Sequence, residues 1–399
     1  MSYSKHTWTP ARDIPSLDGK VILITGGSNG IGRQSAIDLA KHKPAEIWIA
    51  ACSTPGAEAV ITAIGKIDAS VSAKFLEMDL TSFASIRNAA RQFLAAASRL
   101  DILLLNAGVI NVPVGSTTEQ SYDMHFGTNH VGHALLLNLL VPLLRTTAGT
   151  VIDSDVRVIF VSSLAHRFPP TGGLNFESFK PPTGGAGLSS NALYGQRKLA
   201  NVLYAREVAA RYPQWTTASV HPGAVMTDLH KEKSDNWMMK VFQKAVLPFI
   251  GVDVEEGAKS QLWAATAEGV VSGEYYDPVG VARKGSALSK DKSLAKRLWE
   301  WTEKEFGGRI ALTFPTKRGL RPRYIKNIIL SVSFDLRKPN LSFGRVYITN
   351  LTRTKVGDTM ARFCRLSPVR LVPQALRGAS ANATSAPTSK SRSSHHRIF

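Results

Sequence analysis

The stretch that decides the fold is VILITGGSNGIG, residues 21–32, followed by RQSAIDLAK at residues 33–41. A short apolar, β-branched run is followed by three glycines and then by a segment of helical spacing. Gly26 would allow a tight strand-to-helix turn, Gly30 a close approach of the backbone to a pyrophosphate, and Gly32 close packing of helix on strand. The free N–H groups of such a turn and the helix dipole favour phosphate, so the stretch predicts a dinucleotide site. The alternative is an ordinary βα turn.

Short apolar runs and segments of helical spacing alternate along most of the chain. After residues 21–25, the expected strands are residues 46–51, 74–78, 102–106, 156–162, 218–221 and 274–276. Several are apolar on both faces, as strands covered by helices on both sides must be, which predicts a mostly parallel sheet. Between the third and fourth strands, residues 83–97 have helical spacing, with Thr81 or Ser82 placed to cap the helix. The predicted fold class is therefore α/β, a doubly wound, mostly parallel sheet of the Rossmann type.

The basic charge of the chain is concentrated at its C-terminal end. Of the formal net charge of +19, residues 309–399 carry 18 Lys and Arg against 2 Asp and Glu, a net of +16, so the first 308 residues carry only +3. The α/β alternation also stops there. We therefore expect an N-terminal arm (1–16), a single Rossmann-type domain (17–308) and a basic, disordered C-terminal extension (309–399). A tail that contacts RNA, DNA or anionic lipid is the alternative for the last part, whereas no nucleic acid is expected to bind the near-neutral core.

The remaining composition predicts a globular protein in a reducing compartment. Hydrophobic residues make up 44% of the chain, which is enough for a full core. Cys52 and Cys364 have neither disulfide-framework nor zinc-site spacing, and no metal is expected. The N-terminus lacks the apolar run of a secretory signal, and the apolar stretch 134–144 contains Asn138 and Pro142 and is too short to span a bilayer. We expect a cytoplasmic protein with no transmembrane segment.

The segment Thr25-Gly-x-x-x-Gly-Ile-Gly32 resembles the fingerprint of the short-chain dehydrogenases/reductases, and further motifs of that family follow in order. Asp79-Leu80 resembles the family's adenine contact, and Asn106-Ala107-Gly108 resembles its NAG motif beside the cofactor. Residues 222–227 resemble the segment that holds the nicotinamide carboxamide and the phosphates. Taken alone, Asp79 could be a capping carboxylate and Pro222-Gly223 a plain turn.

This resemblance covers about residues 15–307 and implies a nicotinamide cofactor. The expected cofactor-binding residues are Gly26, Ser28, Asn29, Gly30, Ile31, Gly32, Arg33, Asp79, Leu80, Asn106, Ala107, Gly108, Tyr194, Lys198, Pro222, Gly223, Val225 and Thr227.

Tyr194 and Lys198 stand four residues apart in the helical segment 193–211, so both side chains point to one face. A free phenol has a pKa of about 10, and a nearby ammonium together with the positive nicotinamide ring would stabilise its phenolate. By the resemblance, Tyr194 would exchange a proton with the substrate oxygen during hydride transfer, and Ser163 would hydrogen-bond the same oxygen. Asn129 resembles the family's fourth catalytic member, which holds a water near Lys198 in a proton relay.

Each of these catalytic assignments has a structural alternative. A tyrosine and a lysine at i and i+4 occur by chance in many helices, Asn129 could be a helix cap or a buried amide, and Ser162 could replace Ser163. The 31 positions between Ser163 and Tyr194 are expected to hold a Gly/Pro-rich loop, which resembles an insertion of the retinol-dehydrogenase-like and fungal oxidoreductase branch. Three histidines have no metal-ligand spacing and are expected to be loop or packing residues: His133, His166 and His221.

The end of the second strand bears on the choice of coenzyme. It reads Ile49-Ala50-Ala51-Cys52-Ser53, without a carboxylate for the ribose 2′-hydroxyl. Because an NAD-preferring site usually has an acidic residue there, NADP(H) is predicted over NAD(H). The related branch carries an arginine where Ser53 stands, so we expect Arg33, at the helix start, to be the cationic partner of the 2′-phosphate.

The segment 228–252 is where the family places its mobile lid. It holds large apolar residues that include Trp237, Met238, Met239 and Phe242. Flexible methionines beside aromatic rings suit an apolar ligand of irregular shape, which predicts a bulky, mainly apolar ketone, aldehyde or secondary alcohol. Polyketide-, terpenoid-, steroid- or retinoid-like molecules, as in secondary metabolism, are examples. The alternative is a plain amphipathic helix packed on the core.

Two other classes of function compete with an oxidoreductase acting on a carbonyl/alcohol pair. A non-catalytic nucleotide sensor would usually lack the Tyr-x-x-x-Lys pair, and a nucleic-acid or membrane-surface protein would depend on the basic tail. Family members commonly pair through the helices that here hold residues 129–144 and 194–212, so a homodimer or homotetramer is expected.

Overall fold

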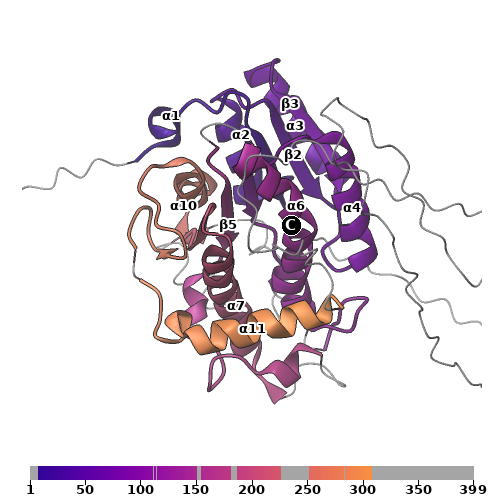
Figure 1. The fold of residues 1–399 in the computed structure, drawn as a ribbon, viewed down its shortest axis with the longest axis vertical. Coiled ribbons are helices and arrows are strands. Elements are labelled where there is room, and N and C mark those ends of the chain that lie inside the picture. The colour runs from indigo at the N-terminus through magenta and orange to yellow at the C-terminus, as the bar shows by residue number, and fades with distance from the viewer. Residues whose placement is uncertain are drawn as a thin grey trace, which may run out of the picture. The chain divides into compact units, whose positions relative to one another are not determined.

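Seven parallel strands form one sheet in the order β3-β2-β1-β4-β5-β6-β9 (Figure 1). The computed structural model describes residues 8–307, with gaps at 111, 114, 151–153, 181–186, 226–250 and 283, and the described residues fall in one compact unit. The strands are β1 Val21–Thr25, β2 Glu46–Ala51, β3 Ser72–Glu77, β4 Ile102–Leu105, β5 Arg157–Val161, β6 Thr216–Val220 and β9 Tyr275–Tyr276. The strand order reverses between β1 and β4, which confirms the predicted doubly wound fold.

Helices cover both faces of this sheet. The helices are α1 Pro10–Asp13, α2 Gly30–Ala40, α3 Thr54–Ile67, α4 Phe83–Ala96, α5 Met124–Phe126, α6 Gly132–Thr150, α7 Ser190–Arg211, α10 Val254–Thr266 and α11 Lys292–Glu305. Alternate residues of β1 enter two separate cores because successive strand side chains point to opposite faces. Val21 and Leu23 pack with α4, α6, α7 and α11, whereas Ile22 and Ile24 pack with α2, α3 and α10. This double coverage explains the strands that are apolar on both faces.

The sequence pattern located the seven strands to within two residues at each end. Ser82 rather than Thr81 caps α4, because its Oγ accepts a hydrogen bond from the Ser85 amide at 3.4 Å. Two short strands outside the main sheet, β7 Ala224–Val225 and β8 Gly251–Val252, pair in parallel and were not expected. A strand of two residues has no alternation for a sequence pattern to detect.

The expected loop between Ser163 and Tyr194 contains two 3₁₀ turns. They are η2 Leu164–Arg167 and η3 Phe176–Phe179. Phe179 is fully buried and stacks on Phe126 of α5 with ring centroids 3.6 Å apart. This loop therefore supplies core side chains as well as connecting β5 to α7.

One helical stretch among the described residues is long and apolar enough to cross a membrane. Residues Met124–Thr150 join α5, the π-helical turn η1 (Gly127–Val131) and α6, with a mean hydropathy of 1.3. More than half of that stretch is buried inside the fold, and its leucines 135, 136, 137, 140 and 144 belong to the core. Packing within the protein therefore accounts for its apolar character.

The last helix, α11, closes the side of the fold that holds α7. Figure 1 shows α11, in orange, running across α7. Leu294 and Leu298 enter the core, and Trp299 stacks on Tyr204 of α7 with ring centroids 4.8 Å apart. The Tyr122 hydroxyl donates a hydrogen bond of 2.6 Å to Glu305, a residue 183 positions away in the sequence.

Candidate active site

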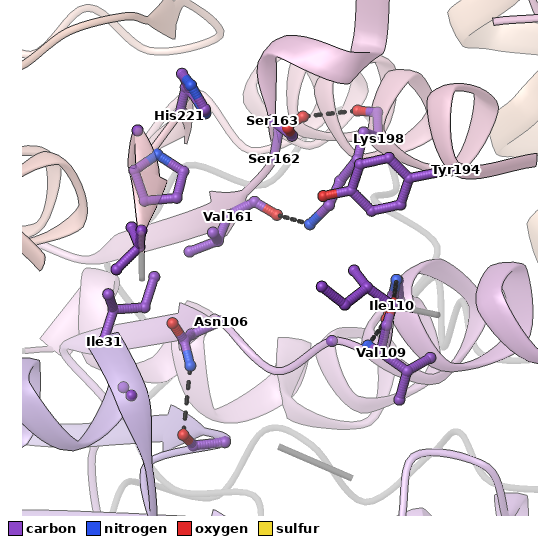
Figure 2. Close-up of a pocket in the computed structure, with 18 of the residues that line it drawn as sticks. Ile31, Asn106, Val109, Ile110, Val161, Ser162, Ser163, Tyr194, Lys198 and His221 are labelled. Atoms are coloured by element: carbon purple, nitrogen blue, oxygen red, sulfur yellow. Dashed lines mark hydrogen bonds between the residues drawn. The ribbon is translucent and has the colours of Figure 1, made fainter. Parts of the chain in front are cut away.

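A cavity lies at the carboxyl ends of β1, β4, β5 and β6, where doubly wound sheets place their ligands. Figure 2 shows Tyr194, Lys198 and two serines on one side of it, and Asn106, Val109 and Ile110 on the opposite side. Its lining residues are Gly26, Asn29, Gly30, Ile31, Gly32, Asn106, Gly108, Val109, Ile110, Asn129, Val161, Ser162, Ser163, Tyr194, Lys198, His221, Pro222, Gly223 and Val225.

The glycine turn after β1 brings backbone to the cavity wall. Gly26 has a φ of +66°, and a Cβ on Gly32 would lie 2.3 Å from the Gly26 carbonyl oxygen and 2.5 Å from Nδ2 of Asn106. The Asn29 side chain accepts a hydrogen bond of 2.7 Å from the Gly30 amide. The amides of Ile31 and Gly32 fall in the first turn of α2, where a helix has no acceptor of its own. Such a wall fits the phosphates of a dinucleotide.

A second, smaller cavity shares Gly26 with the first. It is lined by Gly26, Ala50, Ala51, Cys52, Met78, Leu80 and Ala107, at the ends of β2 and β3. The two cavities therefore meet at the glycine turn. The glycine turn thus lies between a cavity that contains Tyr194 and a smaller, mostly apolar one that contains Ala51 and Leu80.

The Thr25 hydroxyl connects the glycine turn to the end of β4. It accepts hydrogen bonds from the amides of Asn106 (2.9 Å) and Ala107 (3.0 Å), and it lies 2.9 Å from Nε2 of His133. The other ring nitrogen of His133 faces the Asn129 carbonyl oxygen at 3.2 Å. A carbonyl oxygen accepts only, so Nδ1 carries the proton and Nε2 is an acceptor for the Thr25 hydroxyl, which also faces the Leu104 carbonyl oxygen at 3.3 Å.

His133 is thus a buried residue of α6 whose ring links the Thr25 hydroxyl to the main-chain carbonyl of Asn129. Burial lowers its pKa to about 4, so the ring is neutral at physiological pH. His166, also fully buried, accepts a hydrogen bond from the Ser286 amide (3.1 Å), and its Nδ1 lies 2.8 Å from the Ser163 carbonyl oxygen. His221 lines the main cavity, which the sequence did not predict.

The geometry separates the two candidate serines after β5. The Ser162 hydroxyl is buried and donates to the main-chain carbonyl of Lys198 at 2.8 Å, as Figure 2 shows. Ser163 is partly exposed at the cavity, and its Oγ accepts a hydrogen bond from the Ala165 amide at 3.2 Å. The Ser163 hydroxyl retains its own proton for a ligand, so Ser163 is placed for the role expected of it and Ser162 is occupied structurally.

Tyr194 and Lys198 both line the cavity from α7. The Lys198 Nζ donates to the Val161 carbonyl oxygen at 3.1 Å and lies 6.0 Å from the centroid of the Tyr194 ring. Burial, followed by the positive charge of Arg197, lowers the pKa of Lys198 to about 7. A lysine with such a pKa can gain or lose a proton near neutral pH.

Gly195 allows the segment after Ser163 to lie directly on α7. A Cβ at this position would meet the Phe168 carbonyl oxygen at 2.2 Å and the Ala165 carbonyl oxygen at 3.1 Å. Gly195, which directly follows Tyr194, therefore allows the main chain at Ala165 and Phe168 to contact α7. The family motif leaves this position open, so its role could not be predicted from the motif.

Asn129 lies in the π-helical turn η1 with both polar atoms of its side chain occupied. Its Oδ1 accepts from the Val109 amide at 2.8 Å, and its Nδ2 donates to the Val109 carbonyl oxygen at 3.1 Å. The side chain thereby anchors the chain after β4 at the cavity wall. Its Oδ1 keeps a second lone pair and its Nδ2 a second N–H, so the water expected from the resemblance could still bond to this side chain.

The structure brings most of the expected site residues to the two cavities. Three expected residues line neither cavity: Ser28, Arg33 and Asp79. Ser28 is buried near α3, and Arg33 is exposed on α2. The Asp79 carboxylate accepts hydrogen bonds from the Thr81 amide and hydroxyl at 2.8 Å each. Thr227 and the expected lid, except for β8, lie outside the described residues. Cavity residues that the sequence analysis missed are Val109, Ile110, Val161, His221, Ala50, Ala51, Cys52 and Met78.

Comparisons with known proteins agree with this architecture. Residues 20–180 match the family model described as short chain dehydrogenase. A short-chain dehydrogenase/reductase of Armillaria gallica is 37% identical over 305 residues, which are 75% of this chain and 94% of that protein. Human retinol dehydrogenase 11 is 33% identical over 289 residues, 71% of this chain and 85% of that protein.

Solved structures share the fold. The Pseudomonas aeruginosa RhlG/NADP active-site complex has a TM-score of 0.51 at 23% identity and covers 65% of this chain and 94% of its own. The glycine turn, the Tyr194 and Lys198 pair and these relatives together lead to one conclusion. The chain belongs to the retinol-dehydrogenase-like branch of the short-chain dehydrogenase/reductase family and is an NAD(P)-dependent oxidoreductase.

Proposed function

We propose that this protein interconverts a carbonyl and an alcohol on a bulky, mainly apolar small molecule, with NADP(H) as coenzyme and with Ser163, Tyr194 and Lys198 as the reactive side chains. One observation carries the proposal. These three side chains, from the end of β5 and from α7, line the same cavity as the glycine turn. A non-catalytic nucleotide sensor would have no need for that convergence.

The side chains divide the chemistry among them. The nicotinamide ring supplies or accepts the hydride when it is bound. The Tyr194 hydroxyl donates a proton to the substrate oxygen in reduction and removes one in oxidation. Ser163 donates a hydrogen bond to the same oxygen and offsets its developing charge. Lys198 keeps two N–H groups beyond its bond to Val161, and these are available for the nicotinamide ribose.

The preference for NADP(H) rests on the end of β2 and on Arg33. The second cavity, at the β2 end, is lined there by Ala51 and Cys52, with no carboxylate to repel a 2′-phosphate. Arg33 is exposed in the first turn of α2, beside the glycine turn that the two cavities share. We assign it as the phosphate partner, with Asp79 and Leu80 on the adenine side.

The substrate class rests on the apolar side chains around the reactive end. Val109 and Ile110 line the cavity opposite Tyr194. In the segment after Ser163, outside the cavity lining, Leu164 is 41% exposed and Phe168 is 67% exposed. These residues offer contact area to an apolar ligand, to which the expected lid residues Trp237 and Met238 would add.

The remaining expectations complete the proposal. We place the enzyme in the cytoplasm, with the stretch Met124–Thr150 as a core helix, and we expect a homodimer or homotetramer that pairs through α6 and α7. The catalytic domain is residues 17–308, and the basic segment 309–399 is an extension that catalysis does not need. Sedimentation of the purified protein would measure the oligomeric state.

The test of the proposed function is an absorbance assay with each nicotinamide coenzyme and a panel of carbonyl compounds and alcohols of graded size and polarity. We expect turnover with NADP(H), with kcat/KM rising from small polar to large apolar substrates. Coenzyme binding without turnover of any pair would support the nucleotide sensor instead. A preference for small polar substrates would remove the proposed substrate class but retain the reaction.

A further inference from the structure

A second cation lies against the tyrosine of the proposed reaction. Arg197, three residues after Tyr194 on α7, is fully buried, and its Cζ lies 3.9 Å from the centroid of the Tyr194 ring. Tyr194 and Lys198 line the main cavity, whereas Arg197 does not. The guanidinium therefore contacts the ring from within the protein.

Among the described residues, this guanidinium has no hydrogen-bond acceptor. None of its three nitrogens is bonded, and no ion pair to Arg197 occurs within the part of the chain that the structure describes. A buried charge without a partner costs several kcal/mol, so an arginine in this place is a poor choice for stability alone. Strongly perturbed charged groups of this kind concentrate at functional sites.

Arg197 remains a cation across the neutral pH range. Burial lowers its pKa to about 9, against the opposing attraction of Tyr194 and Asp123. Two titratable groups around it, Lys198 and His125, are not fully charged at neutral pH. Burial and the charge of Arg197 bring the pKa of Lys198 to about 7, and burial lowers the pKa of His125 on α5 far enough to keep it neutral.

Two further groups complete these surroundings. The Asp123 carboxyl caps α5 through a 2.9 Å bond from the Phe126 amide, and burial raises its pKa. His221, at the end of β6, has its pKa lowered by burial and lies near Lys198. Of these groups, Arg197 is the one stacked on the Tyr194 ring.

We infer that Arg197 is a positioning residue for the proposed reaction: its buried guanidinium holds the plane of the Tyr194 ring and stabilises the phenolate that takes the substrate's proton. The inference rests on the proposed function. A cation over an aromatic face is attracted to the ring by about 0.5–2 kcal/mol, more strongly when desolvated. A positive charge at this distance also favours the anionic form of the phenol over the neutral form.

The test compares three variants with the wild type in the full chain. Arg197→Met removes the charge but keeps an unbranched side chain that suits burial, and Arg197→Lys keeps the charge. Arg206→Met is the matched control, because it removes a partly buried arginine from the same helix nine residues further on. The readouts are the pH dependence of kcat/KM for alcohol oxidation and the pH titration of tyrosinate absorbance, with Tyr194→Phe subtracted to isolate one tyrosine.

In Arg197→Met, the acid limb of the pH profile should move about one unit to higher pH, and the Tyr194 absorbance titration should move in the same direction. Both should stay in place in Arg197→Lys and in Arg206→Met. A folded Arg197→Met protein with an unmoved titration would overturn the inference. So would failure of both Arg197 variants to fold while Arg206→Met folds, since Arg197 would then be structural.

The absorbance titration needs no turnover, so the inference and the proposed function can fail separately. If the wild type turns over no substrate but its Tyr194 titration depends on Arg197, the proposed function is wrong and the electrostatic role of Arg197 stands. If the wild type is active and its profile is independent of Arg197, only the inference is wrong.

Discussion

One wall of the main cavity consists of backbone groups, and the other wall consists of side chains. The wall after β1 is made of backbone: the amides at the start of α2, the Gly26 carbonyl and the close approach of Gly32. The wall formed by α7 is made of side chains, with two buried cations, Lys198 and Arg197, beside one phenol. The first wall is tied to β4 through the Thr25 hydroxyl, and the second is held against the Ser163 segment at Gly195.

The two walls should therefore respond differently to mutation and to pH. A backbone wall has fixed partial charges and no titratable group, so it responds to added atoms and not to pH. A wall of buried cations responds to the loss of one functional group and to pH, because burial has moved the pKa of each cation toward neutrality. Binding of the coenzyme phosphates and proton exchange with substrate can therefore be altered one at a time.

The largest effect is expected from the side-chain wall. Tyr194→Phe removes only the hydroxyl that exchanges the proton, so kcat should fall by about 10³-fold. The melting temperature and the coenzyme dissociation constant should stay near those of the wild type. A kcat within a few fold of the wild type would show that Tyr194 is not the proton-exchanging group.

In the backbone wall, the effect is expected from a steric clash that an added side chain causes. In Gly32→Ala the new methyl group would lie 2.3 Å from the Gly26 carbonyl oxygen, so the turn must shift. We expect a loss of coenzyme affinity of at least about tenfold and of stability by about 1–3 kcal/mol, measured by fluorescence titration and denaturant unfolding.

The matched control for this change is Gly65→Ala on α3. Nothing lies within 4 Å of the added methyl group there. A helix interior gains about 0.5–1 kcal/mol when glycine becomes alanine, so this variant should be slightly more stable and should bind coenzyme normally. Equal behaviour of the two variants would contradict the role given to the turn.

A pH dependence of coenzyme binding should belong to the side-chain wall alone. The pKa of Lys198 is lowered to about 7, and in the proposed complex its ammonium form donates to the ribose. Affinity is therefore complete below about pH 7 and falls as pH rises, by at most about tenfold per unit, because binding must take up a proton. Lys198→Met should bind more weakly and lose this slope, as calorimetric titrations at several pH values would show. A slope that persists in the variant would assign it to another group.

A smaller effect is expected at the edge of the backbone wall. Arg33→Ala should weaken NADP(H) binding about tenfold, which is the loss of one charge-assisted hydrogen bond, and leave NAD(H) binding nearly unchanged. Dissociation constants for both coenzymes measure this directly. Equal losses for both, or none for either, would remove Arg33 as the 2′-phosphate partner.

The smallest effect is expected outside both walls. A chain ended after residue 308 loses a net charge of +16 but none of the residues that line the cavities. Its kcat/KM and melting temperature should match those of the full chain. Lost solubility or activity in the shortened protein would show that the basic segment supports the domain.

The sequence predicted the backbone wall and the spacing of the side-chain wall because both depend on short stretches. Gly26 to Gly32 make one turn, and Tyr194 and Lys198 share one helix face. It did not predict how His133 is used, since the Thr25 hydroxyl that it accepts from is 108 positions away. Nor did it show that Gly195 lies under the Phe168 carbonyl, or that Arg197 is buried, because each depends on which distant segment packs on α7. The expected lid, residues 228–252, stays a prediction, because all of it except β8 lies outside the described residues.

The place of α11 has a consequence for how the enzyme is made. The contact between Tyr122 and Glu305 joins residues 183 positions apart, and Trp299 covers Tyr204 on the helix that carries Tyr194. A ribosome delivers the chain from its N-terminus, so the glycine turn and the helix α10 that packs on α2 are made before α11. The α7 wall, in contrast, stays uncovered until residue 305 has left the exit tunnel. Coenzyme present during synthesis would therefore meet the glycine turn before the α7 wall is enclosed.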